Sequence, residues 1–289
     1  MTTPLLSVVI PTWNRAHIVC EAIESALSQR PEGIEVIVVD DASTDATIER
    51  VKKTFGRRVH LLPLAVQRGQ GAARNAGALL ACGQYISFLD SDDVWLPGKF
   101  DAELRVFAEF PEANAVISDS LNFFQRVADT SSRFAQNGLL AATEGRVSFV
   151  EEIDWLWTNS TNTAHTCGIT VCRKVLAQLG RRLFADDLVC CEDWDFQMRL
   201  YSLGKVLVLP EVYSWVRRFK DATRRGRAIP GRPPTKDQQL MLVRARLSVI
   251  ERSKPLAERM RAELAAELER FRLETEDEFA RLTTKIKTA

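Results

Sequence analysis

Short apolar segments alternate with helix-forming stretches through the first 120 residues of the chain. The segment IEVIVV at 34–39 is almost continuously apolar, so it does not suit a sheet with one face in water. Similar segments occur at 5–10, 59–64, 85–89 and 115–118, and apolar residues at helical spacing lie between them. This alternation predicts βαβ units, and therefore an α/β fold with a mostly parallel sheet covered by helices on both faces.

Length and composition narrow the class of protein further. The 289 residues suit one large domain or a core domain with an appendage, and 46% hydrophobic residues suffice for a sizeable core. A formal net charge of +1 argues against a general nucleic-acid binder, which needs a strong basic excess. No apolar run reaches the about 18 residues of a transmembrane helix, and no basic region precedes the first apolar stretch. We therefore expect a cytoplasmic protein without a transmembrane segment, and the sequence is compatible with peripheral membrane contact.

The cysteines and histidines give no metal or disulfide signature. The six cysteines form no Cys-x-x-Cys pair, and most of them lie among apolar residues. Reduced core thiols explain them better than disulfides or a zinc site. The three histidines are scattered along the chain.

The sequence pattern changes after the first half of the chain. Residues 120–165 are rich in Ser, Thr, Asn, Gln and aromatic side chains, as expected for loops around a pocket. Residues 216–236 carry eight basic side chains and one acidic side chain, together with Gly and Pro, which predicts a flexible basic loop. We therefore divide the chain into a main domain, 1–215, the basic loop, 216–236, and a C-terminal helical extension, 237–289.

The extension has an apolar stripe at helical spacing. Such a stripe predicts docking onto the main domain or self-association through a second subunit. Its polar face mixes Glu and Arg, which argues against a helix lying on a membrane surface. The residues of the stripe are Leu256, Met260, Leu264, Leu268, Phe271, Phe279 and Leu282.

A cluster of acidic residues follows the apolar segment at 85–89 in YISFLDSDDVW. Asp90, Asp92 and Asp93 cannot all be buried without partners, because an uncompensated buried charge is very costly. An Asp-x-Asp pair at this point can hold a hard divalent cation, which in turn can hold the diphosphate of a nucleotide. The alternative is an acidic turn that caps the next helix.

Other polar side chains fall at the same edge of the predicted sheet. The carboxyl ends of parallel strands meet at one edge, where ligands bind in open α/β sheets. Asp41, just after the segment at 34–39, could accept the imide N–H of a pyrimidine base. Arg74, on the helix that Gly69 and Gly71 open, could offer a guanidinium fork to phosphate oxygens, although an arginine there is often only a solvated side chain.

Five segments occur together in the order and at the spacing of a known family: SVVIPTWNR, VIVVDDASTD, GAARNAG, GQYISFLDSDDVWLPGKF and CEDWDFQMRL. On these segments, over roughly residues 5–220, the chain resembles the family 2 glycosyltransferases with the GT-A fold. The resemblance implies a single Rossmann-like, mostly parallel sheet flanked by helices, with residues 237–289 as an addition. It also implies inverting transfer of a sugar from a nucleoside diphosphate to a hydroxyl acceptor, with Mn²⁺ or Mg²⁺ as cofactor.

The resemblance also implies roles for individual residues. Asp92 would be the direct metal ligand, and Asp193 would be the catalytic base. The nucleotide would be bound by Pro11, Thr12, Asn14, Asp41, Arg74, Asp90 and Ser91. Apart from the resemblance, aromatic faces suit sugar rings, so we expect the acceptor to be bound by Glu192, Trp194, Trp155 and His165. Without the other segments, Glu192 and Asp193 would be interpreted as an acidic helix start favoured by the helix dipole.

The chain departs from the family pattern at the end of the main domain. Family members often have a Tyr-Arg-x-His run whose histidine can reach the metal, whereas residues 213–218 read YSWVRR. We expect Arg217 or Arg218 to neutralise the leaving diphosphate instead, with the basic loop as a lid. The third metal contact is left open.

Two functions other than sugar transfer would also suit an α/β chain of this kind. A sugar-1-phosphate nucleotidylyltransferase needs a glycine-rich first loop, and PTWNRAH contains no glycine. A catalytically inactive GT-A-like protein could instead act as a binding or scaffolding module through its C-terminal helices. For the transferase we expect a UDP or dTDP donor, with guanosine nucleotides still open. We expect a glycan or lipid-linked glycan acceptor in cell-surface polysaccharide synthesis.

Overall fold

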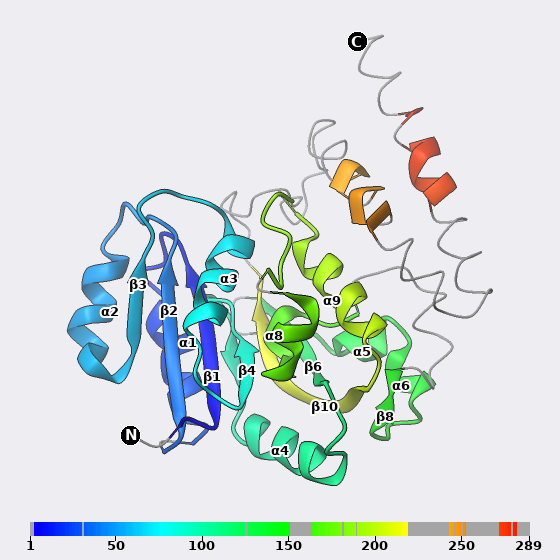
Figure 1. The fold of residues 1–289 in the computed structure, drawn as a ribbon, viewed down its shortest axis with the longest axis horizontal. Helices are drawn as coiled ribbons and strands as arrows, with labels where there is room; N and C mark the ends of the chain where they lie inside the picture. Colours follow the sequence, from blue (N-terminus) through cyan, green and yellow to red (C-terminus); the bar gives the residue numbers. More distant parts are fainter. Residues whose placement is uncertain are drawn as a thin grey trace.

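A computed structural model describes residues 3–30, 32–124, 127–150, 163–180, 182–188 and 190–218, with five short helical pieces between 243 and 281. The pieces are 243–245, 247–249, 251–252, 272–278 and 280–281 (Figure 1). Most of the basic loop, Trp155 and most of the C-terminal extension lie outside the described residues. None of the described helices is both long and apolar enough to span a bilayer.

The strands of the main domain form a 10-stranded sheet in the described part of the chain. The central order is β3-β2-β1-β4-β9-β6-β10-β5, with β7 paired to β6 and β8 paired to β10. The strands are β1 (Leu6–Thr12), β2 (Ile34–Asp40), β3 (His60–Pro63), β4 (Tyr85–Phe88), β5 (Val94–Trp95), β6 (Ala115–Phe124), β7 (Val127–Ala128), β8 (Ser148–Phe149), β9 (Ile169–Cys172) and β10 (Val206–Arg217).

The parallel arrangement expected from the sequence holds for part of this sheet. Strands β1 to β4 pair in parallel, and so do β6 and β10. Strand β9 lies antiparallel between β4 and β6, and β5 lies antiparallel to β10, so the whole sheet is mixed. Two register shifts interrupt the pairing of β10 with β6 between Leu209 and Ser214, where a bulge bends a long strand.

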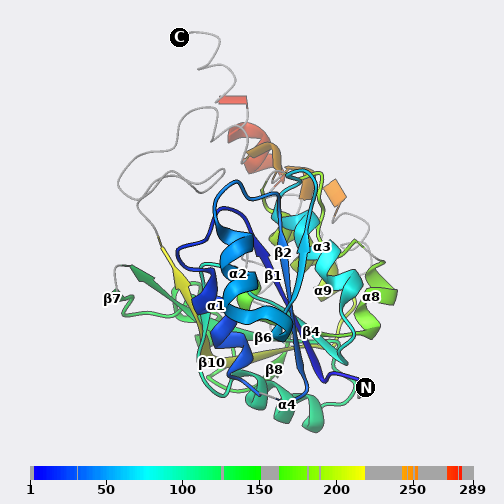
Figure 2. The ribbon, with the colours of Figure 1, turned by 90° about the vertical axis from the view of Figure 1, so that its left-hand side faces the viewer.

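Helices cover both faces of the sheet (Figure 2). Helices α1, α2 and α4 pack on one face, and α3, α8 and α9 pack on the other together with α5 and α6. The helices are α1 (Val19–Leu27), α2 (Thr47–Phe55), α3 (Gln70–Leu80), α4 (Lys99–Glu109), α5 (Arg133–Gln136), α6 (Leu139–Ala142), α8 (Lys174–Leu179) and α9 (Glu192–Ser202).

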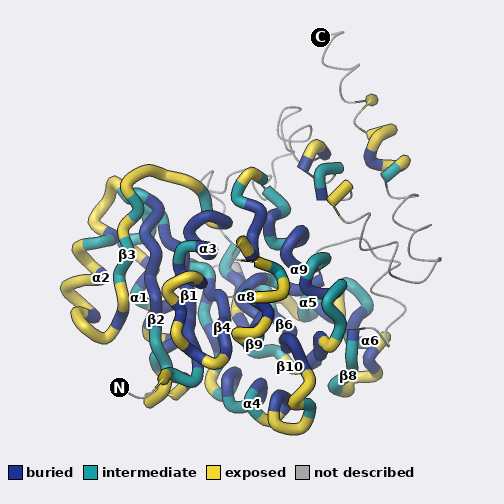
Figure 3. Tube along the Cα trace, viewed as in Figure 1, coloured by how far each residue is buried: buried dark blue, intermediate teal, exposed yellow. Residues whose placement is uncertain are grey.

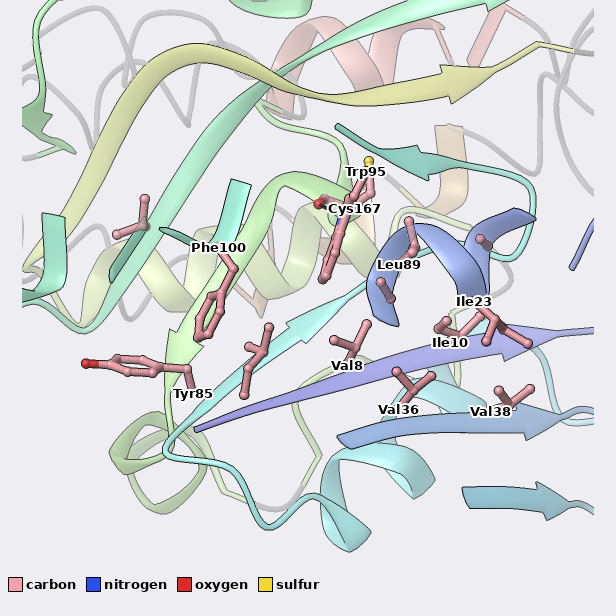
Figure 4. Packing of buried hydrophobic residues seen from close by; sticks show 14 of the residues in the cluster. Val8, Ile10, Ile23, Val36, Val38, Tyr85, Leu89, Trp95, Phe100 and Cys167 are labelled. Carbon is pink, nitrogen blue, oxygen red and sulfur yellow. Dashed lines mark hydrogen bonds between the residues drawn. The ribbon is translucent and has the colours of Figure 1, made fainter. Parts of the chain in front are cut away.

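Alternate residues of the strands supply the two cores. In β1, Val8 and Ile10 face α1 and α4, whereas Val9 faces α3, as the two-residue period of a strand requires. The core between the sheet and helices α1 and α4 contains Ile23 of α1 and Phe100 of α4 (Figure 4). Strands β1, β4 and most of β2 are therefore buried on both faces (Figure 3), which explains their almost continuously apolar sequences.

A glycine sets the distance between α3 and the sheet. A Cβ atom added to Gly77 would lie 2.3 Å from Cγ1 of Val9, so α3 packs directly on β1. This close contact fixes the height of α3 above the sheet, and α3 carries Arg74 in its first half.

Replacement of Gly77 by alanine is therefore expected to lower the free energy of unfolding by about 1–3 kcal/mol, because the added methyl overpacks a rigid contact. Urea denaturation of the variant and the parent protein measures the difference. An unchanged midpoint would show that α3 can move away from β1 without cost.

Candidate active site

The ends of β1, β2 and β4 meet at one edge of the sheet. Thr12 at the end of β1 is the register partner of Asp40 at the end of β2. The backbone pairing continues past both strands, since the N–H of Asp41 donates to the carbonyl of Thr12 at 2.8 Å. Leu89 similarly donates to the carbonyl of Val9 at 3.0 Å, which places the turn after β4 beside the end of β1.

Asn14 links the loops that follow β1 and β2. Its backbone has φ 52°, a left-handed conformation that asparagine tolerates better than most residues. Its N–H donates to Oγ of Ser43 at 2.9 Å, and its Oδ1 accepts the N–H of Thr44 at 2.8 Å. The PTWNR and DDAST segments therefore form one connected surface at the edge of the sheet.

Asp41 lies in this surface and is 4% exposed. Its carboxylate accepts the backbone N–H groups of Arg68 at 2.6 Å and Gly69 at 2.8 Å, just before α3 begins. A carboxylate has about four lone-pair sites, so Asp41 retains capacity for a further donor. No sequence motif predicts this contact between Asp41 and the start of α3. The role of Asp41 toward a base stays a prediction.

The three carboxylates of the acidic turn after β4 differ in exposure: Asp93 is buried, whereas Asp90 and Asp92 are partly exposed. Asp93 is 3% exposed and accepts the N–H of Arg217 at 2.8 Å. The side chains of Asp90 and Asp92 are 32% and 13% exposed. Ser91 between them is buried. Asp90 and Asp92 are therefore the carboxylates of this turn that a ligand can reach.

The residues around Asp92 suit a cation that is shared with a bound phosphate. Among the described residues, no group of three or more His, Cys, Asp or Glu side chains is placed to hold a metal ion. Mg²⁺ and Mn²⁺ prefer oxygen ligands, and Mg²⁺ is often held by one or two carboxylates together with substrate phosphates and water. Asp92 is a carboxylate of this kind, and its Oδ2 lies 3.6 Å from Nη2 of Arg15, so it has one positively charged neighbour in the protein itself.

Arg74 is fully buried between two carboxylates. Its Nη2 lies 2.6 Å from Oδ1 of Asp90, and its Nη1 lies 2.9 Å from Oε1 of Glu192. Burial alone would lower the pKa of Arg74, but the two carboxylates outweigh it and raise the pKa, so the guanidinium keeps its charge. The sequence suggested Arg74 as a nucleotide ligand; in the structure its side chain is 1% exposed and pairs with two protein carboxylates.

Glu192 is the first residue of α9 and is 2% exposed. Burial and the neighbouring Asp193 raise the pKa of its carboxyl group, while Arg74 opposes this shift. Gln70 donates a second hydrogen bond to the same Oε1 atom. Glu192, expected on the acceptor side, therefore faces α3.

Three acidic residues lie in the first turn of α9, where the helix dipole favours negative charge. Asp195 is 2% exposed and accepts a hydrogen bond from Nε of Arg199 at 2.9 Å. Glu192 is held by Arg74, as described above. Asp193 is the partly exposed carboxylate of the three, and its Oδ1 accepts the N–H of Trp194 at 2.9 Å. Of these three groups, Asp193 is the one that solvent reaches.

The other residues predicted on the acceptor side lie in different environments. Trp194 is 5% exposed and packs against Val249 in the C-terminal part, so its ring is largely covered. Pro11 and Thr12, predicted to bind the nucleotide and not the acceptor, are buried at the end of β1. Trp155 lies outside the described residues.

The two arginines at the end of β10 make different contacts. Arg217 donates from Nε to the carbonyl of Asp92 at 3.0 Å and also pairs with Glu21 of α1, so it holds the acidic turn. Arg218 donates to Oδ1 of Asn122 at 2.7 Å and to Nε2 of His165 at 2.8 Å.

His165 brings an imidazole to the end of β10, where this chain lacks the histidine of the family pattern. Since arginine can only donate, Nε2 of His165 accepts from Arg218, and Nδ1 carries the proton toward Oγ of Ser120, 2.7 Å away. His165 precedes β9, far from β10 in the sequence, and only the pairing of β6, β9 and β10 in one sheet brings the two together. The sequence alone could not predict this contact.

Sequence comparison places these residues in a family. The model of the family described as Glycosyl transferase family 2 matches residues 7–177. An uncharacterized glycosyltransferase of Rickettsia felis is 24% identical over 204 residues, which cover 70% of this chain and 32% of the relative. WfaP of Escherichia coli, named as a UDP-Glc:alpha-D-GlcNAc-diphosphoundecaprenol beta-1,3-glucosyltransferase, is 34% identical over 120 residues, covering 42% of this chain and 46% of WfaP. The succinoglycan biosynthesis protein ExoO of Rhizobium meliloti is 45% identical over 96 residues, covering 33% of this chain and 28% of ExoO.

Solved structures share the fold. TarS 1–349 of S. aureus in complex with UDP-GlcNAc superposes with a TM-score of 0.66 at 18% identity, over 96% of this chain and 71% of that one. The mannosyltransferase PcManGT of Pyrobaculum calidifontis, in complex with GDP-Man and Mn²⁺, gives a TM-score of 0.64 at 17% identity, over 100% of this chain and 76% of that one. At these identities the likeness concerns the fold. Because the family match covers 7–177 of 289 residues, more than half of the sequence, this chain belongs to glycosyl transferase family 2 and has the GT-A fold.

Proposed function

We propose that this chain is an inverting, metal-dependent glycosyltransferase that moves a sugar from UDP or dTDP to a hydroxyl acceptor in the synthesis of a cell-surface glycan. One observation carries the proposal: Arg74 binds both Asp90 and Glu192, so the acidic turn and the helix start that carries Asp193 lie on either side of one guanidinium. The names of WfaP and ExoO, which refer to a UDP-glucose donor and to succinoglycan synthesis, support the donor and the pathway class.

The reaction needs a base and a stabilised leaving group. Asp193 takes the proton of the acceptor hydroxyl while that oxygen attacks the anomeric carbon of the sugar. The bond from the anomeric carbon to the diphosphate oxygen breaks on the opposite side, so one displacement inverts the configuration. A cation held by Asp92, when bound, would neutralise charge on the departing diphosphate. Arg15, beside Asp92, contributes a further positive charge at the same point.

The donor base is tested by calorimetric titration with UDP, dTDP, GDP and ADP, each with and without Mn²⁺. Asp41 would accept a hydrogen bond from the imide N–H of uracil or thymine. Adenine has no imide N–H. A hydrogen bond to a charged acceptor is worth about 10- to 100-fold in affinity, so UDP and dTDP are expected to bind that much more tightly than ADP. Equal binding of ADP would contradict the role of Asp41, and binding of no nucleotide would favour a non-catalytic module.

A further inference from the structure

We infer that Arg74 is a positioning residue that fixes the acidic turn after β4 relative to the start of α9. This inference rests on the proposed function, because it gives Arg74 the task of holding Asp92 and Asp193 at the distance that sugar transfer needs. Arg74 touches neither reacting group itself; it acts through Asp90 and Glu192.

The contacts of Arg74 join three separate parts of the fold. The guanidinium comes from α3, Asp90 follows β4, and Glu192 begins α9, 118 positions away from Arg74 in the sequence. Its two terminal nitrogens bind one carboxylate each, at 2.6 and 2.9 Å. The guanidinium also lies over the ring of Phe184, 5.1 Å from its centroid. A planar fork with fixed directions makes this bridge stiffer than a pair of point charges.

Helix α3 is itself held on the sheet and beside α9. Gly77 lies directly on Val9, as described above, and a Cβ added to Gly71 would lie 3.3 Å from Cγ of Glu192. The amide of Asn75 exchanges hydrogen bonds with both the carbonyl and the N–H of Phe184, at 2.8 and 2.9 Å. Arg74 therefore projects from a backbone that has little freedom to move.

The neighbours of the bridge are the residues proposed to act on the substrates. Asp92 lies two positions after Asp90, and Asp193 follows Glu192 directly. A shift of either carboxylate partner of Arg74 would move Asp92 or Asp193 with it. Misplacement of a reacting group by about 1 Å can cost about 100-fold in rate, so a loosened bridge is expected to affect catalysis more than binding.

The substitution R74K tests the positioning role. Lysine keeps the positive charge, but its single ammonium group cannot reproduce the two-directional fork. We expect kcat for sugar transfer to fall by about 100-fold, while the Kd for UDP with Mn²⁺ changes by less than about threefold. A Kd raised by more than about tenfold with unchanged kcat would make Arg74 a nucleotide ligand and overturn the inference.

A matched control is available on α9. Arg199 binds Asp195 at 2.8 Å on the same helix, and the Asp195 side chain is 2% exposed. R199K weakens an ion pair of the same type away from Asp90, so its kcat is expected to stay within about twofold of the parent value. An equal loss of kcat in R74K and R199K would show that general destabilisation of α9 causes the loss, and it would contradict a specific positioning role of Arg74.

A second measurement does not depend on activity. Asp90 and Glu192 bind different nitrogens of Arg74, so the effects of D90N and E192Q on the unfolding midpoint are expected to be non-additive in the double variant. If the two changes in unfolding midpoint were additive, Arg74 would not couple Asp90 to Glu192, and the inference would be wrong. If the parent protein transfers no sugar, the proposed function fails, whereas this cycle still decides whether Arg74 couples the two carboxylates.

Discussion

Replacement of Asp193 by asparagine is expected to lower kcat for sugar transfer by about 10²- to 10⁴-fold, the usual contribution of a general base. Asparagine has nearly the same size and keeps the hydrogen bond from the N–H of Trp194, but it cannot take a proton. The Kd for the nucleotide is expected to stay close to the parent value, since Asp193 acts on the acceptor. Steady-state release of nucleoside diphosphate in the presence of acceptor measures kcat, and calorimetry measures the Kd.

Asp195 provides the matched control on the same helix turn. It carries the same charge as Asp193, but it is buried and paired with Arg199. D195N is therefore expected to lower the unfolding midpoint, because it weakens a buried ion pair, without the large loss of kcat. If D193N kept the parent kcat, Asp193 would not be the catalytic base. An equal loss of kcat in D193N and D195N would indicate a defect of helix α9 as a whole.

Replacement of Asp92 by asparagine is expected to lower kcat/KM by about 10²- to 10³-fold and to abolish most of the stimulation by Mn²⁺. The loss is of the size seen when one preorganised electrostatic partner of a developing charge is removed. Asparagine keeps the shape of the side chain but has no negative charge to hold a cation next to the diphosphate. Transfer rates at increasing Mn²⁺ concentration, with donor well below its KM, provide the measurement.

The neighbouring Asp93 separates this effect from damage to the turn. Asp93 is buried and holds the N–H of Arg217, so D93N removes the same charge from the same turn at a structural position. D93N is expected to reduce stability and to keep the response to Mn²⁺. A parent enzyme that works equally well after removal of divalent cations by a chelator would contradict the metal dependence.

The first half of the fold could be predicted because its signals are local. Strands β1, β2 and β4 are nearly continuous apolar segments, and helices with regular apolar spacing follow β1 and β2 directly. The second half depends on pairing between distant segments. Strand β9 has four residues, ITVC, and becomes a strand because it fits between β4 and β6, which a single-sequence pattern does not express.

The site shows the same division between local and long-range information. The turn after β4 and the acidic start of α9 are visible in the sequence as short motifs. The partners of these carboxylates are not, since the contact of Arg74 with Glu192 spans 118 positions and that of Arg217 with Asp93 spans 124. From the sequence, either Arg217 or Arg218 is expected to neutralise the leaving diphosphate. Strand β10 ends at Arg217, and successive side chains along a strand point to opposite faces. Arg217 therefore contacts the acidic turn, whereas Arg218 contacts His165.

In the proposed enzyme, carboxylates from distant parts of the chain surround one donor site. A crystal structure of the protein grown with UDP and Mn²⁺ tests this arrangement, because anomalous scattering locates the manganese independently of the refined atoms. We predict a manganese peak between Asp92 and the diphosphate, the uracil next to Asp41, and Asp193 facing the diphosphate from α9. Manganese bound away from Asp92, or UDP bound away from the edge formed by β1, β2 and β4, would contradict the account.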